Sequence, residues 1–145
     1  MLKYLCAPLA LLALAVAGCG EDKPSKKEFV ADLDAVCKKS NEKIQKLDNP
    51  TTIKQIPTFV RESRVVLDDS IKEAEKLELP DEDGDKFKSY ISDSKKSLSA
   101  LNELEQAAEQ DNEAEIKRIF TETTRDNQKR DAEAKRLGLK QCGSG

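Results

Sequence analysis

The chain has 145 residues, of which 37% are charged, and 25 basic residues stand against 28 acidic residues for a net charge of −3. This mildly acidic balance provides no basic surface for nucleic acid or for anionic lipid headgroups. The absence of histidine excludes serine–histidine and cysteine–histidine nucleophilic catalysis and removes the commonest zinc ligand. We therefore expect a non-enzymatic protein with no cofactor, no metal centre and no nucleic-acid partner.

The chain opens on a short apolar segment that ends at a cysteine. Lys3 and the amino terminus form a positively charged start, and a run of 13 residues follows from Leu5 to Ala17, all apolar or small except Pro8. A membrane-spanning helix needs roughly 20 residues, so this run fits the apolar region of a secretory signal peptide better.

The end of the apolar segment, Val16-Ala17-Gly18-Cys19, resembles the lipobox of bacterial prolipoproteins, in which an aliphatic and two small residues precede an obligatory cysteine. The resemblance implies that residues 1–18 are a signal peptide and that Cys19 carries a diacylglyceryl group. The protein would then be exported and anchored by lipid to a bacterial membrane, facing the periplasm or the cell exterior. An ordinary signal peptide with a chance cysteine is the alternative. Residues 19–24 would be a lipidated tether, and residues 25–145 the folded domain.

The four cysteines of the chain fall into three roles. Cys6 leaves with the signal peptide and Cys19 carries the lipid, which leaves Cys37 and Cys142 as a pair in an exported, oxidising compartment. Redox-active pairs usually have C-x-x-C spacing, whereas these two cysteines lie 105 residues apart. We therefore predict a structural disulfide between Cys37 and Cys142.

The first two helices are indicated by apolar residues at helical spacing and by clear end signals. A capping box formed by Ser25 and Glu28 begins the first helix, and Asp48-Asn49-Pro50 ends it. The second helix begins between Thr52 and Pro57, because proline is tolerated in a first turn, and it ends at Leu79-Pro80.

The third and fourth helices follow two polar breaks. The third begins after the acidic stretch DEDGD at residues 81–85, where glycine comes too early for an EF-hand loop, so we interpret the stretch as a solvated turn. The fourth begins at a cap formed by Asp111 or Asn112. It ends at Gly138, which suits a Schellman stop covered by Leu139.

Four helices joined by short links predict an all-α, antiparallel four-helix bundle. In up-down order the fourth helix ends near the start of the first, so we expect residues 138–142 to run back along the first helix and bring Cys142 to Cys37. The segments EFVADLDAVCKKSNEKI and LGLKQCG also resemble a group of small secreted lipoproteins typical of actinobacteria. That resemblance implies a helical lipoprotein and supplies no catalytic residue.

Polar residues interrupt the inward stripe of the fourth helix at Asn127, Arg130 and Asp131. Because a buried charge needs a partner, these three residues could line a polar binding pocket. They could equally mark the end of the bundle, where the chain opens to solvent or meets the segment that carries Cys142. Serines on the inward stripes of the other helices either line the same seam or allow close helix packing; they are Ser40, Ser63, Ser70 and Ser94.

Two functional hypotheses follow from these features. The first is a lipid-anchored helical module on the outer side of a bacterial membrane that binds a protein or another envelope component. The alternative is a solute- or metal-binding lipoprotein that uses a polar pocket in the bundle. A filled core would favour the first hypothesis, and a deep pocket near Asn127 and Arg130 would favour the alternative.

Replacing Cys19 with alanine should remove the site of lipid attachment. We expect the Cys19→Ala protein either to be released from membranes or to accumulate as an unprocessed precursor, because neither acylation nor the cleavage that depends on it can occur. Membrane fractionation and intact mass measurement check this outcome. A variant that stays membrane-bound and is processed like the parent protein would contradict the lipobox interpretation.

Overall fold

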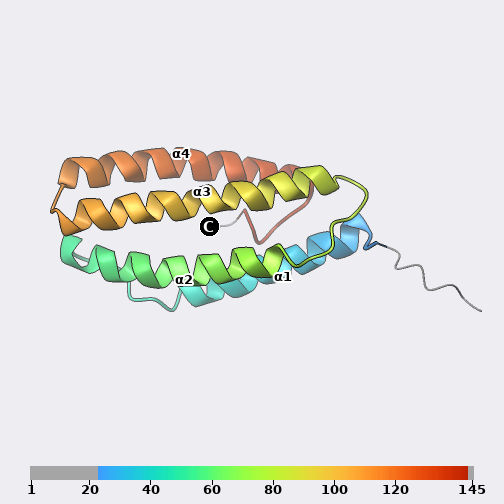
Figure 1. The fold of residues 1–145 in the computed structure, drawn as a ribbon, viewed down its shortest axis with the longest axis horizontal. Helices are drawn as coiled ribbons and strands as arrows, with labels where there is room; N and C mark the ends of the chain where they lie inside the picture. The colour runs from blue at the N-terminus through green and yellow to red at the C-terminus, as the bar shows by residue number, and fades with distance from the viewer. Residues whose placement is uncertain (1–22, 144–145) are drawn as a thin grey trace, which may run out of the picture.

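The computed structural model describes residues 23–143 and contains four helices, with no strand among those residues (Figure 1). The helices are α1 (Lys26–Ile44), α2 (Ile56–Ala74), α3 (Gly84–Glu109) and α4 (Glu113–Leu137), and a 3₁₀ turn, η1 (Ile53–Gln55), precedes α2. The predicted all-helical fold is confirmed. The predicted signal peptide and Cys19 lie outside the described residues. Between residues 23 and 143, no helix combines the length and apolar character needed to cross a bilayer.

Local hydrogen bonds define the helix ends that the sequence predicts. The Ser25 hydroxyl accepts the backbone N–H of Glu28, and the Glu28 carboxylate accepts the backbone N–H of Ser25, which completes the capping box of α1. Asn112 caps α4 through its side chain. Gly138 adopts a φ of 89°, and the N–H of Leu139 donates to the carbonyl of Ala134 at 2.9 Å. This left-handed glycine forms the predicted stop of α4.

Helices α1 and α2 end slightly earlier than their apolar patterns suggest. Each continues into a hydrogen-bonded turn, in which Leu47 donates to Ile44 and Leu77 donates to Ala74. Such i→i−3 bonds tighten the last turn of a helix. The apolar spacing therefore persists for a few residues beyond the regular helical hydrogen bonding.

The helices pack in chain order and form an open series. Helix α1 packs on α2, α2 packs on α3, and α3 packs on α4, whereas α1 and α4 share no comparable packing. Figure 1 shows the four helices side by side, with the C-terminal segment lying between the end of α4 and α1. The two outermost helices are therefore joined through core side chains and the C-terminal segment rather than by a close helix–helix contact.

The apolar side chains form two separate cores. The first core joins the first half of α1 and the start of α3 to the ends of α2 and α4; it contains Phe29, Leu33, Ala74, Phe87, Tyr90, Ile91, Ala134, Leu137 and Leu139. The second core joins the start of α2 to the end of α3 and the start of α4; it contains Ile56, Val60, Leu104, Ala107, Ala108, Ile116 and Ile119. Phe29 and Phe87 anchor the first core, with ring centroids 4.7 Å apart.

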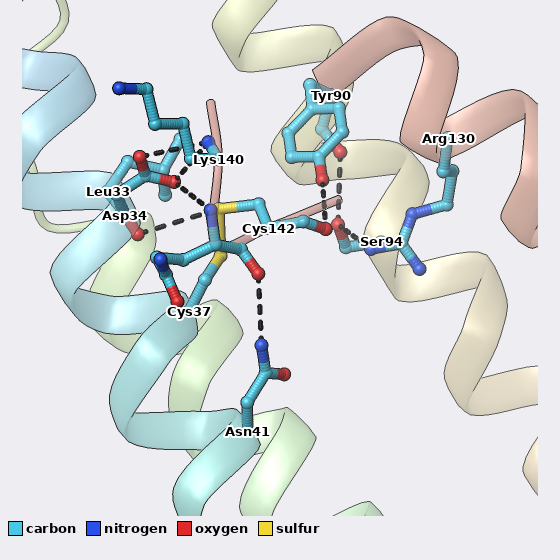
Figure 2. Close-up of a disulfide and its surroundings, with 10 residues drawn as sticks. Leu33, Asp34, Cys37, Asn41, Tyr90, Ser94, Arg130, Lys140 and Cys142 are labelled. Atoms are coloured by element: carbon cyan, nitrogen blue, oxygen red, sulfur yellow. Dashed lines mark hydrogen bonds between the residues drawn. A yellow bond between two sulfur atoms is a disulfide. The ribbon is translucent and has the colours of Figure 1, made fainter. Parts of the chain in front are cut away.

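Residues 138–142, the C-terminal strap, connect α4 to α1. The backbone N–H groups of Lys140 and Gln141 donate to the Asp34 carboxylate at 2.9 and 2.8 Å, and the Asn41 amide donates to the Gln141 carbonyl at 3.0 Å (Figure 2). A disulfide joins Cys142 to Cys37, whose Cα atoms lie 5.0 Å apart. The predicted disulfide and the predicted return of the chain along α1 are both confirmed.

Removing the disulfide should destabilise the protein. The bond links residues 105 positions apart, and closing a loop of about 100 residues stabilises a fold by up to about 4.7 kcal/mol in the chain-entropy treatment. We expect the Cys37→Ala/Cys142→Ala variant to lose several kcal/mol of unfolding free energy, measured by urea denaturation of the full chain. Asp34→Ala, which keeps the bond, should lose less. An unchanged urea midpoint for the double variant would show that the strap holds α1 without the disulfide.

Candidate functional site

A cavity of about 580 Å³ lies between the two apolar cores. All four helices contribute to its wall, and Cys142 of the strap borders it. Residues of the first core, such as Leu33 and Tyr90, and residues of the second core, such as Val60 and Leu104, face the same space. Ligand pockets in proteins usually measure about 300–1,000 Å³, so this volume is large enough for a small organic molecule.

Serine residues occupy inward positions where larger apolar side chains would fill the interior. The serines that line the cavity are Ser40, Ser63, Ser70, Ser94 and Ser97. Ser40 and Ser63 are only 6% and 4% exposed. Because a hydroxymethyl group is much smaller than a leucine or isoleucine side chain, a row of serines leaves space between helices that otherwise pack closely. The serines predicted to lie on the inward stripes therefore line a hollow in the interior.

Arg130 forms a polar cluster with two of these serines. Its guanidinium group donates to the Ser97 hydroxyl at 2.9 Å and to the Ser94 hydroxyl at 3.3 Å. The guanidinium carbon lies 5.8 Å from the centre of the Tyr90 ring, a distance at which a cation is attracted to an aromatic face. Figure 2 shows Arg130 reaching from α4 toward Ser94, with Tyr90 beside it.

Tyr90 connects this cluster to the strap. Its hydroxyl donates to the carbonyl of Cys142 at 3.2 Å, and its backbone carbonyl accepts from the Ser94 hydroxyl at 3.1 Å. Burial raises the pKa of Tyr90, and the positive charge of Arg130 only partly opposes that effect. Tyr90 therefore keeps its proton at neutral pH and acts as a hydrogen-bond donor to the strap.

The positive charge of Arg130 has no carboxylate partner within residues 23–143. No ion pair joins it to any acidic side chain of that part of the chain, and its Nε atom is buried without a hydrogen-bond partner there. Other partly buried cations do have such partners: Lys26 pairs with Asp83, and Arg64 pairs with Glu105. A partly buried guanidinium without a counter-ion is unfavourable, so this position is suited to an external anion.

The structure places all three residues of the predicted polar pocket around this cavity. Asn127, Arg130 and Asp131 all line it, with Asn127 exposed and the other two partly buried. Arg130 also approaches the strap through Tyr90, so the two sequence interpretations, a pocket and a junction with the Cys142 segment, describe neighbouring parts of one region. The sequence analysis missed Ser97 and the role of Tyr90. The signal for Ser97 was its position three residues after Ser94 on the same helical face.

The cavity opens to solvent along α4. Phe120 and Asn127 line the cavity and are both exposed, with Phe120 at 51%. Phe120 shares the helical spacing of the buried residues Ile116 and Ile119, yet half of its surface is exposed. Since α1 and α4 do not pack on each other, Phe120 lies at the mouth of the cavity instead.

The acidic turn at residues 81–85 binds lysine side chains. Lys23 pairs with Asp81 at 2.6 Å, and Lys26 pairs with Asp83 at 2.7 Å. Hydrogen bonds from Lys26 and Lys86 lower the pKa of Asp83 from 3.8 to about 2. These contacts fasten the start of α1 to the start of α3, so the carboxylates of this turn have a structural role.

Comparison of the chain with protein-family models, curated proteins and solved structures gives no match. The likeness to prolipoproteins and to small actinobacterial lipoproteins therefore stays a prediction from the residues that carry it. The cavity and its unpaired arginine are the features of the described structure that bear on function.

Replacing Ser63 with alanine should stabilise the protein. The Ser63 hydroxyl is buried and has no hydrogen-bond partner within the described part of the chain, and leaving such a group unpaired costs roughly 1–3 kcal/mol. We expect Ser63→Ala to raise the free energy of unfolding by about 1 kcal/mol, measured by urea denaturation. Ser94→Ala, which removes a hydroxyl bonded to Tyr90 and Arg130, should lower it. A loss of stability in Ser63→Ala would show that its hydroxyl is satisfied.

Proposed function

We propose that this protein is a lipid-anchored, non-enzymatic solute-binding protein of a bacterial envelope. It holds a small, largely apolar molecule in the cavity between its helices. The single observation that carries this proposal is the hollow of about 580 Å³ that separates the two cores. The hollow opens to solvent along α4, and its volume lies within the roughly 300–1,000 Å³ that is usual for ligand pockets. A bound molecule would fill this space.

The chemistry of the cavity wall supports an apolar solute. Most of the lining is apolar, and its aliphatic residues include Leu33, Val36, Leu67, Ile91 and Leu101. The polar groups of the wall are hydroxyl groups of serine, threonine and tyrosine and amide groups of asparagine. One arginine and one aspartate are its charged residues. Many apolar contacts with a few polar groups at fixed positions are typical of small-molecule binding sites.

The open edge of the helix series supplies a route into the cavity. Phe120 presents half of its surface to solvent at the mouth, which gives an entering apolar molecule its first contact. The strap borders one part of the cavity and is fixed to α1 by the disulfide and by Asp34. We propose that entry occurs between α1 and α4 and that the antiparallel helix order, favoured by the short links, leaves this edge open.

The protein-binding hypothesis has less support. A filled core would favour the protein-binding hypothesis, whereas the described structure contains a large hollow between its helices. Outside the cavity mouth, the large exposed apolar residue in the described chain is Val65, at 62%, and single apolar residues on a surface are ordinary. Within residues 23–143 no three potential metal ligands among histidine, cysteine, aspartate and glutamate gather in one place. The solute-binding form of the alternative hypothesis is therefore the one that we propose.

Photolabelling in native membranes tests the proposed function. The probe is a long-chain fatty alcohol that carries a diazirine, added to membranes containing the full-length protein. We expect cross-links on peptides that line the cavity in α1, α2 and α3, and we expect excess unlabelled alcohol to reduce them. Peptide mapping by mass spectrometry distinguishes these sites from contacts of the tether with the bilayer.

Two matched variants make the labelling experiment specific. Ser70→Leu places a larger side chain in the cavity wall, whereas Ser92→Leu makes the same change at an exposed position of α3 outside it. We expect Ser70→Leu to reduce cavity labelling severalfold and Ser92→Leu to leave it unchanged, with both proteins folded by circular dichroism. Labelling confined to exposed peptides, or equal in both variants, would contradict the proposal.

A further inference from the structure

We infer that the bound solute is an anionic amphiphile, with one singly charged head group bound to Arg130 and an apolar body in the rest of the cavity. This inference rests on the proposed function, because it assigns a chemical class to the solute of the same cavity. It depends on three observations: the unpaired guanidinium, its fixed orientation, and the balance of charge in the cavity wall.

The guanidinium of Arg130 is oriented by the protein and still has capacity to bind. Two of its nitrogens donate to Ser97 and Ser94, while the buried Nε has no partner within residues 23–143. The serine hydroxyls are neutral, so they hold the group in place without compensating its charge. Arginine presents several donors in a planar fork that matches a carboxylate or phosphate oxygen pair. A bound anion would supply the counter-charge and accept from the N–H groups of the two terminal nitrogens that the serines leave unused.

The charge of the cavity wall favours a single negative charge on the solute. Arg130 and Asp131 are the two charged residues among the described residues that line the cavity. Neighbouring residues on a helix point in different directions, and Asp131 forms no ion pair with Arg130 in the described chain. The backbone at Asp131 lies against Gly143, beyond the strap. Its carboxylate would repel a dianionic head group more strongly than a monoanionic one, so a single negative charge suits a wall with one cation better.

The body of the solute is expected to be apolar because the wall away from Arg130 is aliphatic. Leu67 and Leu101 line the cavity, as do Ile119 and the half-exposed Phe120. A neutral apolar molecule would leave Arg130 without a counter-ion, and a small hydrophilic anion would leave these side chains around empty space. An amphiphile with one anionic end satisfies both parts of the wall.

Three photoreactive probes with the same alkyl chain test the inference. They end in a carboxylate, an alcohol or an amine, and each is added at mildly alkaline pH to membranes that contain the full-length protein. We expect the carboxylate to label cavity peptides at least about tenfold more than the alcohol, since hydrogen bonds to charged groups contribute more than neutral ones. The amine should label least. A phosphodiester lipid carrying the same diazirine shows whether the head group is a carboxylate or a phosphodiester.

Substitutions at Arg130 test whether this side chain causes the preference for the carboxylate probe. Arg130→Gln should abolish the preference for the carboxylate while leaving labelling by the alcohol, and Arg130→Lys should retain part of it. Arg125→Gln makes the same charge change on the exposed surface of α4, where Arg125 is 66% exposed, and should leave the preference intact. If Arg130→Gln does not fold, Asp131→Asn tests the inference instead, because it removes the negative charge beside Arg130. A stronger preference for the carboxylate probe over the alcohol probe would support the inference, and an unchanged preference would overturn it.

The outcomes separate the inference from the proposed function. Equal labelling by carboxylate and alcohol in the parent protein would overturn the anionic head group while leaving a neutral solute. Loss of preference in Arg125→Gln as well as in Arg130→Gln would show that overall charge, and not this site, selects the probe. No cavity labelling by any of the probes would overturn both.

Discussion

The connection between α4 and α1 through the C-terminal strap is the constraint on which the rest of the structure depends. These two helices lie at the ends of an open series and do not pack on each other. The strap joins them through the disulfide between Cys37 and Cys142, and Asp34 binds two of its backbone N–H groups. A four-helix bundle normally closes by burying apolar side chains between its first and last helices. Here the disulfide and the polar contacts of the strap join the two helices beside the first core, in which Phe29 and Leu33 of α1 cluster with Ala134 and Leu137 of α4.

The same junction fixes the polar groups of the cavity. Tyr90 donates to the strap and contacts Arg130, and Ser94 bonds to both residues. The position of the arginine is thus determined by α3 and by the strap together. A polar group held by several partners keeps a defined orientation in a low-dielectric interior, and such an orientation is what selective binding of an anion requires. Structural closure and the proposed solute recognition therefore use neighbouring residues.

Two cores, one on each side of the cavity, explain how a hollow bundle remains folded. The first is anchored by Phe29 and Phe87, which are almost completely buried, and the second by Val60. Each core joins the ends of several helices: α2, α3 and α4 contribute residues to both cores, and the α1 residues belong to the first core. Serines in the space between the cores reduce the volume of the side chains that meet there. The cavity thus results from the distribution of side-chain size: large apolar residues form the two cores, and serines line the space between them.

The sequence by itself determined the features that depend on neighbouring residues or on elimination. Ser25, Asn112 and Gly138 form the helix ends that their local chemistry predicts, and the pairing of Cys37 with Cys142 followed from the roles assigned to the other cysteines. Only the tertiary structure decided that α1 and α4 stay apart, that Phe120 is exposed, and that Arg130 finds serines and no carboxylate. The helical spacing of apolar residues predicts which residues face inward, but it does not predict how far away the opposite helix lies. That distance is set by side chains far apart in the chain, and here it leaves a cavity.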